Sequence, residues 1–424
     1  MEPIDLTQTI DQSKAMQEIV LPIMISYKQK RDTQLSEEEK IEFTKKLREI
    51  KKNSLDNMDI LQEQTISQLE TNGIKVIKAK TPADAHNAIK EIIGKEKLVI
   101  KSKSNTANEI DLHSALKDYE LLETDLGDFI VQITKAKDLH PVLPAVHLTP
   151  EEITKTIYTK FGKKISSEPE TIANFVRDHL REKMKKAKIG ITGANVITAD
   201  GSIFILENEG NISLTSTLPD KHIILSSFEK IVPTREDALQ IIKAAANFGT
   251  GQNYPSYVNV ISGPSKTADI QNKLITGAQG AKEVYLILLD NKRTEILNSE
   301  FKELLYCIHC GACVNLCPVY HQVFTRFGAP YFPGSNGIIS SFFKESPKQA
   351  YLNGAYFCTT CKLCKENCPL NIDLSEMIRL VRIQLVKNNL YPLTLNEMMK
   401  NVKEFGNPFG KVKEGEIPDK LYCC

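Results

Sequence analysis

Apolar residues are spaced in two different ways over the first two thirds of the chain. Over residues 1–70 they recur every three or four positions among charges of both signs, which predicts helices with one exposed face. After this segment, short apolar runs alternate with amphipathic stretches. Residues 73–79 and 97–103 are typical of strands, and residues 81–95 between them are typical of a helix. This alternation predicts an α/β fold with a mainly parallel sheet that helices cover on both faces.

The same alternation continues through the middle of the chain. A long helix is expected from Glu168 to about Lys188, and it leads into the strand-like residues 188–206. Near Phe301 the sheet pattern stops. Further strands are predicted at residues 118–125, 127–133, 140–146, 221–227, 258–262 and 283–290.

Beyond Phe301 the residues favour helices again. Two helical segments, 300–327 and 345–369, flank a stretch rich in Gly and Pro, and residues 374–389 form an amphipathic helical pattern. The changes of pattern divide the chain into an N-terminal helical segment, an α/β domain, a helical cysteine-rich domain and a tail. The expected limits of these four parts are residues 1–70, 71–298, 299–390 and 391–424.

Composition restricts the class of protein. The 424 residues include 54 Lys and Arg against 53 Asp and Glu, and the net charge of +1 disfavours a general nucleic-acid or anionic-lipid binder. With 41% hydrophobic and 25% charged residues the chain can bury a core, which excludes a disordered or collagen-like protein. No apolar run reaches the roughly 18 residues of a membrane span, and the N-terminus lacks a signal-peptide pattern, so we expect a cytoplasmic protein.

Cysteine is the most informative residue type. Ten are present, none of them among the first 306 residues, and eight fall between Cys307 and Cys368. These eight form two copies of C-x2-C-x2-C-x3-C-P, the spacing of two-cluster ferredoxins, in which the fourth cysteine of each run binds the other cluster. The expected ligand sets of two [4Fe–4S] clusters are therefore crossed. Cys307, Cys310, Cys313 and Cys368 hold cluster 1, and Cys358, Cys361, Cys364 and Cys317 hold cluster 2.

Other interpretations of the cysteines are weaker. Zinc modules usually separate two C-x2-C pairs by roughly a dozen residues or more, which these runs do not. The long spacer between Cys317 and Cys358 resembles the helical ferredoxin modules of the iron–sulfur subunits of succinate dehydrogenase and heterodisulfide reductase, which relay single electrons. His309 could replace a thiolate, but we expect either a polar neighbour that tunes the cluster or an exposed residue. Cys423 and Cys424 are expected to be surface thiols, with metal binding or a contact to a partner as alternatives.

A series of motifs runs through the α/β domain between residues 99 and 291. In order they are VIKSKSNTANEIDL, LLETDLGDFIVQI, PAVHLT, ITGANVITADGSI, ENEGN, FEKIVPT, GTGQ and VYLILLDN. This order resembles the lactate utilisation protein B family, whose members join a lactate-utilisation (LUD) domain to a two-cluster ferredoxin module. Together with the cysteine runs, the resemblance covers roughly residues 70–390.

The resemblance implies a function, partners and a fold. It implies an iron–sulfur subunit of a flavin-independent complex that oxidises L-lactate to pyruvate, working with a second LUD-domain subunit and a cysteine-rich subunit similar to heterodisulfide reductase. The LUD domain is similar to the sugar-phosphate isomerase and CoA-transferase-like α/β fold. Three departures concern the substrate: Asn105 stands where the family usually has Met, residues 195–201 are one residue shorter, and the family's C-terminal extension is missing.

Polar residues at the ends of the predicted strands are candidates for substrate binding. The carboxyl edge of a parallel sheet is where α/β folds bind ligands, and glycine turns there let backbone amides approach an anion. Each of these residues has an alternative role in an ordinary turn, cap or loop. The candidates are Lys101, Lys103, Ser104, Glu123, Thr124, Asp125, Gln132, Thr192, Gly193, Asn195, Asn208, Gly210, Asn211, Thr250, Gly251 and Gln252.

Two residues are candidates for acid–base chemistry. Glu209 follows an apolar strand, a position like that of the reactive glutamate in CoA-transferase-like folds, and is either a general base or part of a turn. His147 could accept the proton of a hydroxy acid or serve as a packing residue. No dinucleotide-binding or P-loop motif accompanies them, so neither NAD nor ATP is implied.

Three functions follow from these observations. The first is the electron-transfer subunit of a lactate-oxidising complex. The second is a relay subunit of a heterodisulfide-reductase-like complex with another substrate. The third is an isomerase or acyl-CoA enzyme with accessory clusters, which depends on Glu209 alone.

Overall fold

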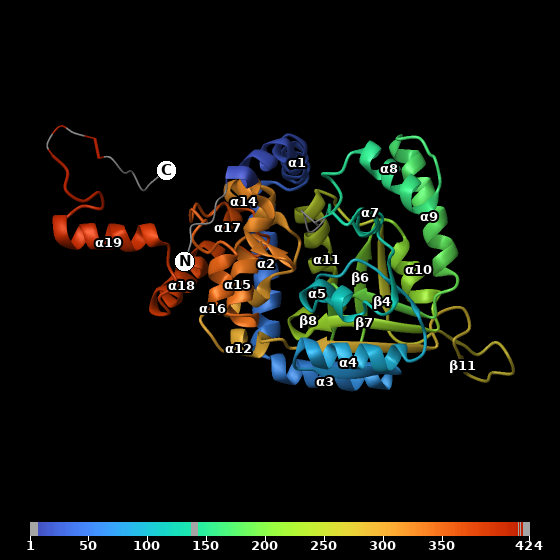
Figure 1. Cartoon of the computed structure of the whole chain (residues 1–424). Coiled ribbons are helices and arrows are strands. Elements are labelled where there is room, and N and C mark those ends of the chain that lie inside the picture. The colour runs from blue at the N-terminus through green and yellow to red at the C-terminus, as the bar shows by residue number, and fades with distance from the viewer. Residues whose placement is uncertain (1–6, 137–142, 414, 416, 419–424) are drawn as a thin grey trace.

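The computed structural model describes residues 7–136, 143–413, 415, 417 and 418. Its N-terminal part contains three helices, α1 (Thr7–Gln34), α2 (Glu37–Asp56) and α3 (Met58–Thr71), as the spacing of apolar residues predicted. A capping box of Ser36 and Glu39 begins α2, because each residue bonds the other's backbone N–H. Helix α1 packs on both larger parts of the molecule, against α11 and α14, and lies above them in Figure 1.

A six-stranded parallel sheet forms the centre of the α/β domain, which confirms the predicted fold class. The strand order is β1-β12-β7-β4-β2-β3, and every neighbouring pair is parallel. All the carboxyl ends of the strands therefore lie at one edge. The strands are β1 (Ile74–Ala79), β2 (Leu98–Lys101), β3 (Glu120–Glu123), β4 (Ile189–Gly193), β7 (Lys221–Ser227) and β12 (Glu283–Leu289).

Both faces of this sheet are buried. In β7, Ile223 and Leu225 belong to one apolar cluster and Ile224, between them, belongs to another. Successive side chains of a strand point to opposite faces, so helices must cover each side. The covering and connecting elements are α4 (Pro82–Ile93), α5 (Asn105–Glu109), α6 (Leu112–Ala115), α8 (Pro150–Phe161), α9 (Pro169–Met184), α10 (Asn211–Thr217), η1 (Phe228–Lys230), α11 (Arg235–Thr250) and α12 (Arg293–Leu297).

One predicted strand of this domain is wrong. Residues 127–133 lie in a helix, α7 (Leu126–Thr134), whose N-cap Asp125 accepts a hydrogen bond from the Asp128 N–H. The buried residues Phe129, Ile130 and Ile133 fall on one side of this helix, and the apolar run conceals their helical spacing. The strand predicted at residues 140–146 lies partly outside the described residues, and residues 143–146 form no strand.

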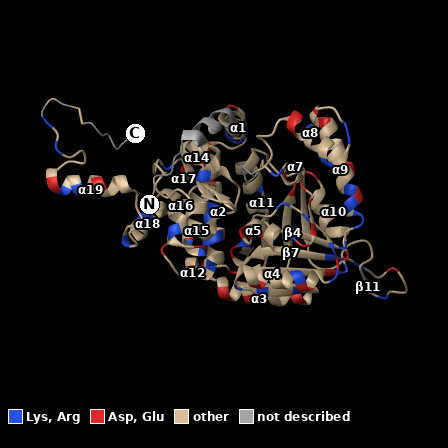
Figure 2. Cartoon of the chain, viewed as in Figure 1, with Lys and Arg blue, Asp and Glu red and all other residues tan. Residues whose placement is uncertain are grey.

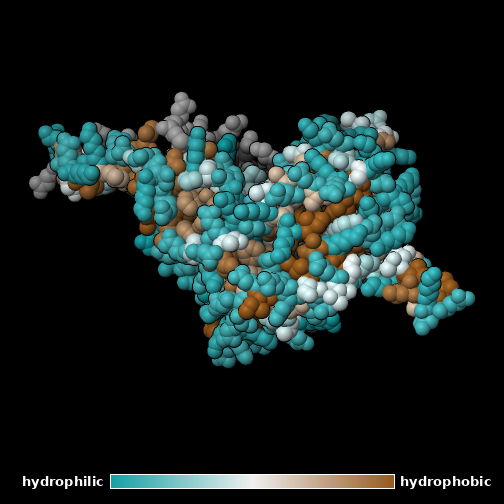
Figure 3. All heavy atoms as spheres, turned by 90° about the horizontal axis from the view of Figure 1, so that it is seen from below, coloured by the Kyte–Doolittle hydropathy of each residue, from teal (hydrophilic) through white to brown (hydrophobic). Residues whose placement is uncertain are grey.

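Smaller sheets extend the α/β domain. A four-stranded sheet has the order β8-β5-β6-β9, and a separate two-stranded hairpin joins β10 to β11. In Figure 3 apolar atoms mark this projecting hairpin, where Ile270 and Leu274 are exposed. The strands are β5 (Val196–Thr198), β6 (Ile203–Glu207), β8 (Ile231–Val232), β9 (Tyr257–Ile261), β10 (Lys266–Thr267) and β11 (Ile275–Thr276).

The cysteine-rich domain is built from short helices and one small hairpin. Its Gly- and Pro-rich stretch forms β13 and β14 and the start of α15, where Gly337 packs against the Phe332 carbonyl with no room for a Cβ. The elements are η2 (Lys302–Tyr306), α13 (Ala312–Asn315), α14 (Pro318–Val323), η3 (Phe324–Arg326), β13 (Gly328–Ala329), β14 (Phe332–Pro333), α15 (Gly334–Lys344), α16 (Pro347–Leu352), α17 (Leu363–Glu366) and α18 (Leu374–Lys387).

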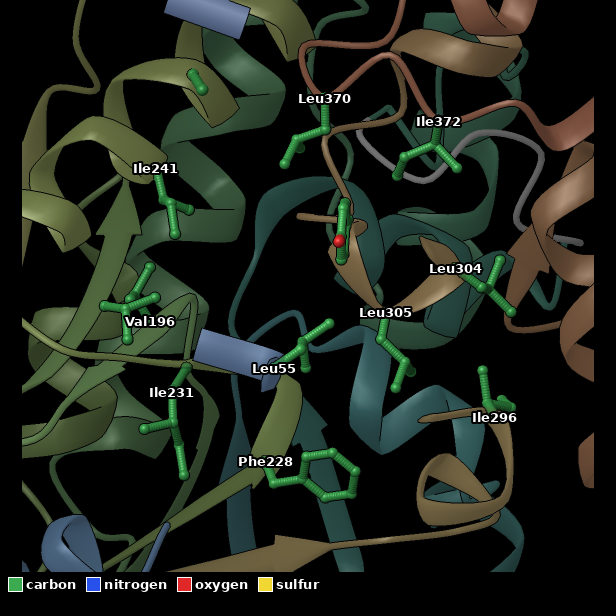
Figure 4. Packing of buried hydrophobic residues seen from close by; sticks show 14 of the residues in the cluster. Leu55, Val196, Phe228, Ile231, Ile241, Ile296, Leu304, Leu305, Leu370 and Ile372 are labelled. Carbon is green, nitrogen blue, oxygen red and sulfur yellow. The ribbon is translucent and has the colours of Figure 1, made fainter. Parts of the chain in front are cut away.

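A single apolar core joins the three parts. Leu55 from α2, Val196 and Phe228 from the α/β domain, and Leu305 and Leu370 from the cysteine-rich domain belong to one buried cluster. Figure 4 shows these side chains on ribbons from all three regions. The cysteine-rich domain is therefore packed on the α/β domain and not tethered by a linker.

The surface carries interspersed charges, and one helix stands apart. Figure 2 shows Lys, Arg, Asp and Glu side by side on α3, α4 and α9. Helix α19 (Leu393–Phe405) contributes no buried residue and projects from the body in Figure 1. Among the described residues, no helix has both the length and the apolar character that a membrane crossing requires.

Candidate functional site

The two cysteine runs fold into loops of the same backbone shape. His309 and Gly311 have positive φ angles of 60° and 83°, and Thr360 and Lys362 at the corresponding positions have 55° and 68°. Positive φ turns successive N–H groups toward the inside of a loop, where they can face a cluster or its sulfur ligands. Two sequences of different composition thus adopt one conformation, as expected if both hold the same kind of group.

Backbone N–H groups already point at cysteine sulfurs. The His309 N–H donates to Cys307 Sγ and the Thr360 N–H to Cys358 Sγ, each at 3.4 Å. Cys317 Sγ, at the start of α14, accepts from the Tyr320 N–H at 3.5 Å. Hydrogen bonds of this kind stabilise cluster-bound thiolates and tune their reduction potential.

The cysteines influence each other's pKa in two groups. Burial raises the pKa of Cys307 to about 12 and that of Cys317 to about 11, so free thiolates are disfavoured and need a nearby cation. An iron–sulfur cluster supplies that cation, and the donor set fits it. The thiol charges that add to these pKa values place Cys307, Cys310 and Cys313 with Cys368, and Cys317 and Cys364 with Cys358 and Cys361. Cys364 also acts on Cys313, so the two groups adjoin each other.

The two groups differ in their exposure. Cys361 is exposed, whereas Cys307, Cys310 and Cys313 are only partly accessible, and Cys307 lines a small cavity with Glu229 and Arg293 of the α/β domain. His309 is turned toward that domain, because its Nε2 lies 3.9 Å from Glu229 and its ring packs on Phe332. Cys423 and Cys424 lie outside the described residues.

A buried ion pair joins the ends of two neighbouring strands. Lys101 ends β2 and Glu123 ends β3, and the register of these strands places them side by side. Lys101 Nζ lies 2.9 Å from the Glu123 carboxylate, whose other contact is His113 Nε2 at 2.5 Å. Although burial opposes it, the Lys101 charge and the His113 contact lower the pKa of Glu123. Glu123 is therefore a carboxylate that orients an imidazole.

His113 was missed in the sequence analysis. It lies on the short helix α6, ten positions before its partner, and no local pattern links the two. Only the parallel pairing of β2 with β3 brings Glu123 to the sheet edge beside α6. The imidazole is 46% exposed, and it faces a cavity.

This cavity of about 750 Å³ separates the carboxyl edge of the sheet from the cysteine-rich domain. Its size is that of small-molecule sites. The α/β domain supplies one wall and the segment around α15 supplies the other. The lining residues are Pro82, Asn108, Glu109, Asp111, Leu112, His113, Glu123, Asp128, Val131, Gln132, Lys135, Ala136 and Asn291, with Pro330, Tyr331, Lys344 and Glu345 opposite.

A group of carboxyls lies at the N-terminus of α7. Glu209 Oε2 accepts a hydrogen bond from the Leu126 N–H at 3.0 Å, and Lys103 Nζ is 3.6 Å from Asp128. Burial, with the charge of Asp125 as a smaller cause, raises the pKa of Glu209 to about 7. Burial likewise raises the pKa of Asp128 to about 7. The carboxyls of Glu209 and Asp128 can therefore each gain or lose a proton near neutral pH.

We expect Asp128→Asn to stabilise the protein at high pH. Because folding raises the pKa of Asp128, the native state keeps a proton that the unfolded chain loses near pH 4, so stability falls as the pH rises toward 7. The gain in unfolding free energy from Asp128→Asn should be larger at pH 8 than at pH 5 by about 2 kcal/mol, measured by urea denaturation. The exposed Asp118→Asn is the control; equal gains at both pH values would contradict the prediction.

Several other candidate residues make structural hydrogen bonds. The Gln132 side chain accepts from the Glu123 N–H and donates to the Leu121 carbonyl. The Thr192 hydroxyl contacts His222 inside the sheet. Similar bonds occupy Ser104 as the N-cap of α5, Asn195 with the Leu206 N–H, Gly210 as the N-cap of α10, Gly251 as the C-cap of α11, and Asn208 and Thr250 with Gln252.

The remaining candidates divide between two places. The Thr124 hydroxyl accepts a hydrogen bond from the Asn211 side-chain amide at 3.2 Å. Thr124 lies near the cluster of carboxyls that contains Asp125 and Glu209. Gly193 packs so closely against Ser104 that a Cβ at this position would lie 2.9 Å from the hydroxyl oxygen. His147 lies apart from these residues. Burial lowers the pKa of His147, and the charge of Glu152 on α8 opposes this effect. Among the described contacts none joins His147 to Glu209.

A buried ionic network connects the cavity wall to the first cysteine loop. Arg293 donates to both oxygens of Glu109, at 2.8 and 2.7 Å, and its Nε lies 2.8 Å from Glu229. Lys344 Nζ lies 2.9 Å from Glu109, and Glu229 faces His309. Despite the opposing effect of burial, Arg293 and Lys344 lower the pKa of Glu109, so it stays ionised. Sequence reasoning singled out His309 but none of Glu109, Glu229, Arg293 and Lys344, because four separate segments supply these four residues.

Two family models match separate parts of this chain. Residues 62–289 match the LUD domain family and residues 303–372 match the 4Fe-4S dicluster domain, which places two [4Fe–4S] clusters on the cysteines. A solved structure described as a DUF162 family protein from Deinococcus radiodurans has 14% identity and a TM-score of 0.31, and it covers 55% of this chain and 98% of its own.

Curated relatives extend over most of the chain. "Lactate utilization protein B 1" of Bacillus mycoides is 34% identical over 84% of this chain and 74% of its own length. "Lactate utilization protein B" of Shouchella clausii is 35% identical over 78% and 69%. "Uncharacterized electron transport protein YkgF" of Escherichia coli is 32% identical over 80% and 70%.

Proposed function

This chain belongs to the LUD-domain family that includes the lactate utilization B proteins, and we propose that it is the iron–sulfur electron-transfer subunit of a complex that oxidises L-lactate to pyruvate. One observation carries the proposal. The two cysteine loops that hold the clusters are packed on a LUD domain whose sheet edge opens into a cavity on the same side. A site for a small molecule and an electron relay are thereby adjacent in one chain.

The number of clusters suits the reaction. Oxidation of a 2-hydroxy acid to a 2-oxo acid releases two electrons and two protons, and each [4Fe–4S] cluster accepts one electron. The clusters supply this one-electron chemistry when bound. The protein holds them between the LUD domain and an exposed edge at Cys361, which supports a route from the cavity side to the surface.

Partners complete the proposed complex. We propose a second LUD-domain subunit and a cysteine-rich subunit similar to a heterodisulfide-reductase catalytic chain. The exposed side of cluster 2 is the place for an electron-accepting partner, because a thiolate at the surface lets another redox centre approach closely.

The test is lactate-dependent reduction of the clusters. The protein is purified anaerobically with its bound partners, and EPR spectra are recorded before and after L-lactate is added. We expect about eight iron per chain and a [4Fe–4S]⁺ signal that grows on addition of L-lactate. D-lactate and malate serve as controls for the substrate. Intact clusters that none of these acids reduces would contradict the proposal.

A further inference from the structure

We propose that the cavity between the two domains binds a small 2-hydroxy carboxylate, and that His113 Nδ1 accepts the proton of its hydroxyl group. This inference rests on the proposed function for the identity of the ligand. It goes beyond that function by assigning the substrate to this chain and by naming the residues that hold it.

The contact with Glu123 determines which nitrogen of His113 is available. The Glu123 carboxylate is ionised and buried, and it lies 2.5 Å from Nε2. An ionised carboxylate can only accept a hydrogen bond, so Nε2 carries a hydrogen, and in the neutral ring Nδ1 is the nitrogen that accepts. Lys101 compensates the Glu123 charge from the buried side. Glu123 thus holds Nε2 of His113, and the ring lies on the wall of the cavity.

Three of the five carboxyls that line the cavity are paired with a cation. Glu109 is paired with Arg293 and Lys344, Glu123 with Lys101, and Asp128 with Lys103. Of the other two, Asp111 caps α6 and Glu345 accepts a hydrogen bond from the Tyr331 hydroxyl. Lys135 lines the same cavity, and no described residue forms an ion pair with it. A lysine at this place can bind the ligand's carboxylate while His113 receives its hydroxyl.

The position of the cavity relative to cluster 1 supports a redox substrate. Lys344 and Glu109 line the large cavity, and Lys344 also lines a small cavity that contains Cys307 and His309. A bound ligand is therefore separated from the first cysteine loop by one layer of buried ion pairs. This arrangement places the ligand on the side of the first cysteine loop.

The step assigned to His113 is a proton transfer. The O–H bond of the ligand breaks, a bond forms between Nδ1 and that hydrogen, and the imidazolium charge is stabilised by Glu123. No covalent bond to carbon is formed or broken by His113.

The experiment compares ligand binding with cluster reduction in the same preparations. The full-length, cluster-loaded protein with its partners is titrated anaerobically with L-lactate by calorimetry, and the rate of lactate-dependent cluster reduction is followed by absorbance. We expect His113→Ala to slow reduction about 100-fold, and Lys135→Ala, an exposed position, to weaken binding about tenfold. His113→Gln should restore part of the binding because its carbonyl accepts a hydrogen bond. His86→Ala, outside the cavity, is the matched control.

The outcomes separate this inference from the proposed function. Wild-type rates in His113→Ala together with wild-type affinity in Lys135→Ala would overturn the assignment of the cavity and leave the lactate-oxidising function intact. In another outcome, the wild-type protein binds L-lactate, Lys135→Ala does not, and L-lactate fails to reduce the wild-type clusters. This outcome would support the assignment of the ligand to the cavity and refute the proposed function. Iron content and thermal melting of each variant show whether a loss reflects folding.

Discussion

Arg293→Met is expected to destabilise the protein by about 3 to 5 kcal/mol. The guanidinium is buried and is the shared partner of Glu109 and Glu229, so its removal leaves two carboxylates in the interior without their main counter-charge. Lys344 compensates only the first of them. A single buried charge left without a partner costs far more than an exposed ion pair contributes. Urea denaturation under anaerobic conditions, followed by circular dichroism, measures the change.

A second arginine provides the control for this prediction. Arg235 is paired with Asp200 at the surface, at 2.5 Å and with 59% of its side chain exposed. Arg235→Met removes the same chemical groups, and we expect a loss of at most about 1 kcal/mol. Equal shifts of the urea midpoint in the two variants would show that the buried network adds nothing to stability beyond an exposed ion pair. A shift confined to Arg293→Met would show that the buried network stabilises the fold.

The sequence predicted the parts of this protein that local spacing determines. Strands buried on both faces appear as short apolar runs, and the cysteine ligands of each loop are near neighbours in the chain. Residues 127–133 are the exception within the sheet domain. Their continuous apolar run suits a buried strand and a buried helix equally, and the cap formed by Asp125 decides for the helix.

The cavity could not be predicted because its residues meet only through the tertiary fold. Glu123 was a candidate from its place at a strand end, but its partner His113 lies on a helix before that strand. The network of Glu109, Arg293 and Lys344 draws on α5, α12 and α15. A charged residue in an amphipathic segment normally indicates an exposed position, and the sequence contains no sign that these charges are buried together.

The crossed arrangement of cluster ligands gives a prediction that two double variants test. If Cys368 completes cluster 1, Cys313→Ala/Cys368→Ala removes two ligands from that cluster and leaves cluster 2 with all four thiolates. We expect about four iron per chain and one intact [4Fe–4S] EPR signal on reduction. The effect of Cys368 on the thiol pKa values of Cys307 and Cys310 supports this expectation.

Cys313→Ala/Cys317→Ala is the matched control, since it removes the same number of thiols within one loop. With crossed ligands this variant takes one thiolate from each cluster, so we expect no intact four-thiolate cluster and a [3Fe–4S] signal or a loss of iron from both sites. If each loop instead held its own cluster, the two variants would exchange their results. Because the proline after Cys317 and the proline after Cys368 both direct the chain away from their own loops, we expect the crossed result.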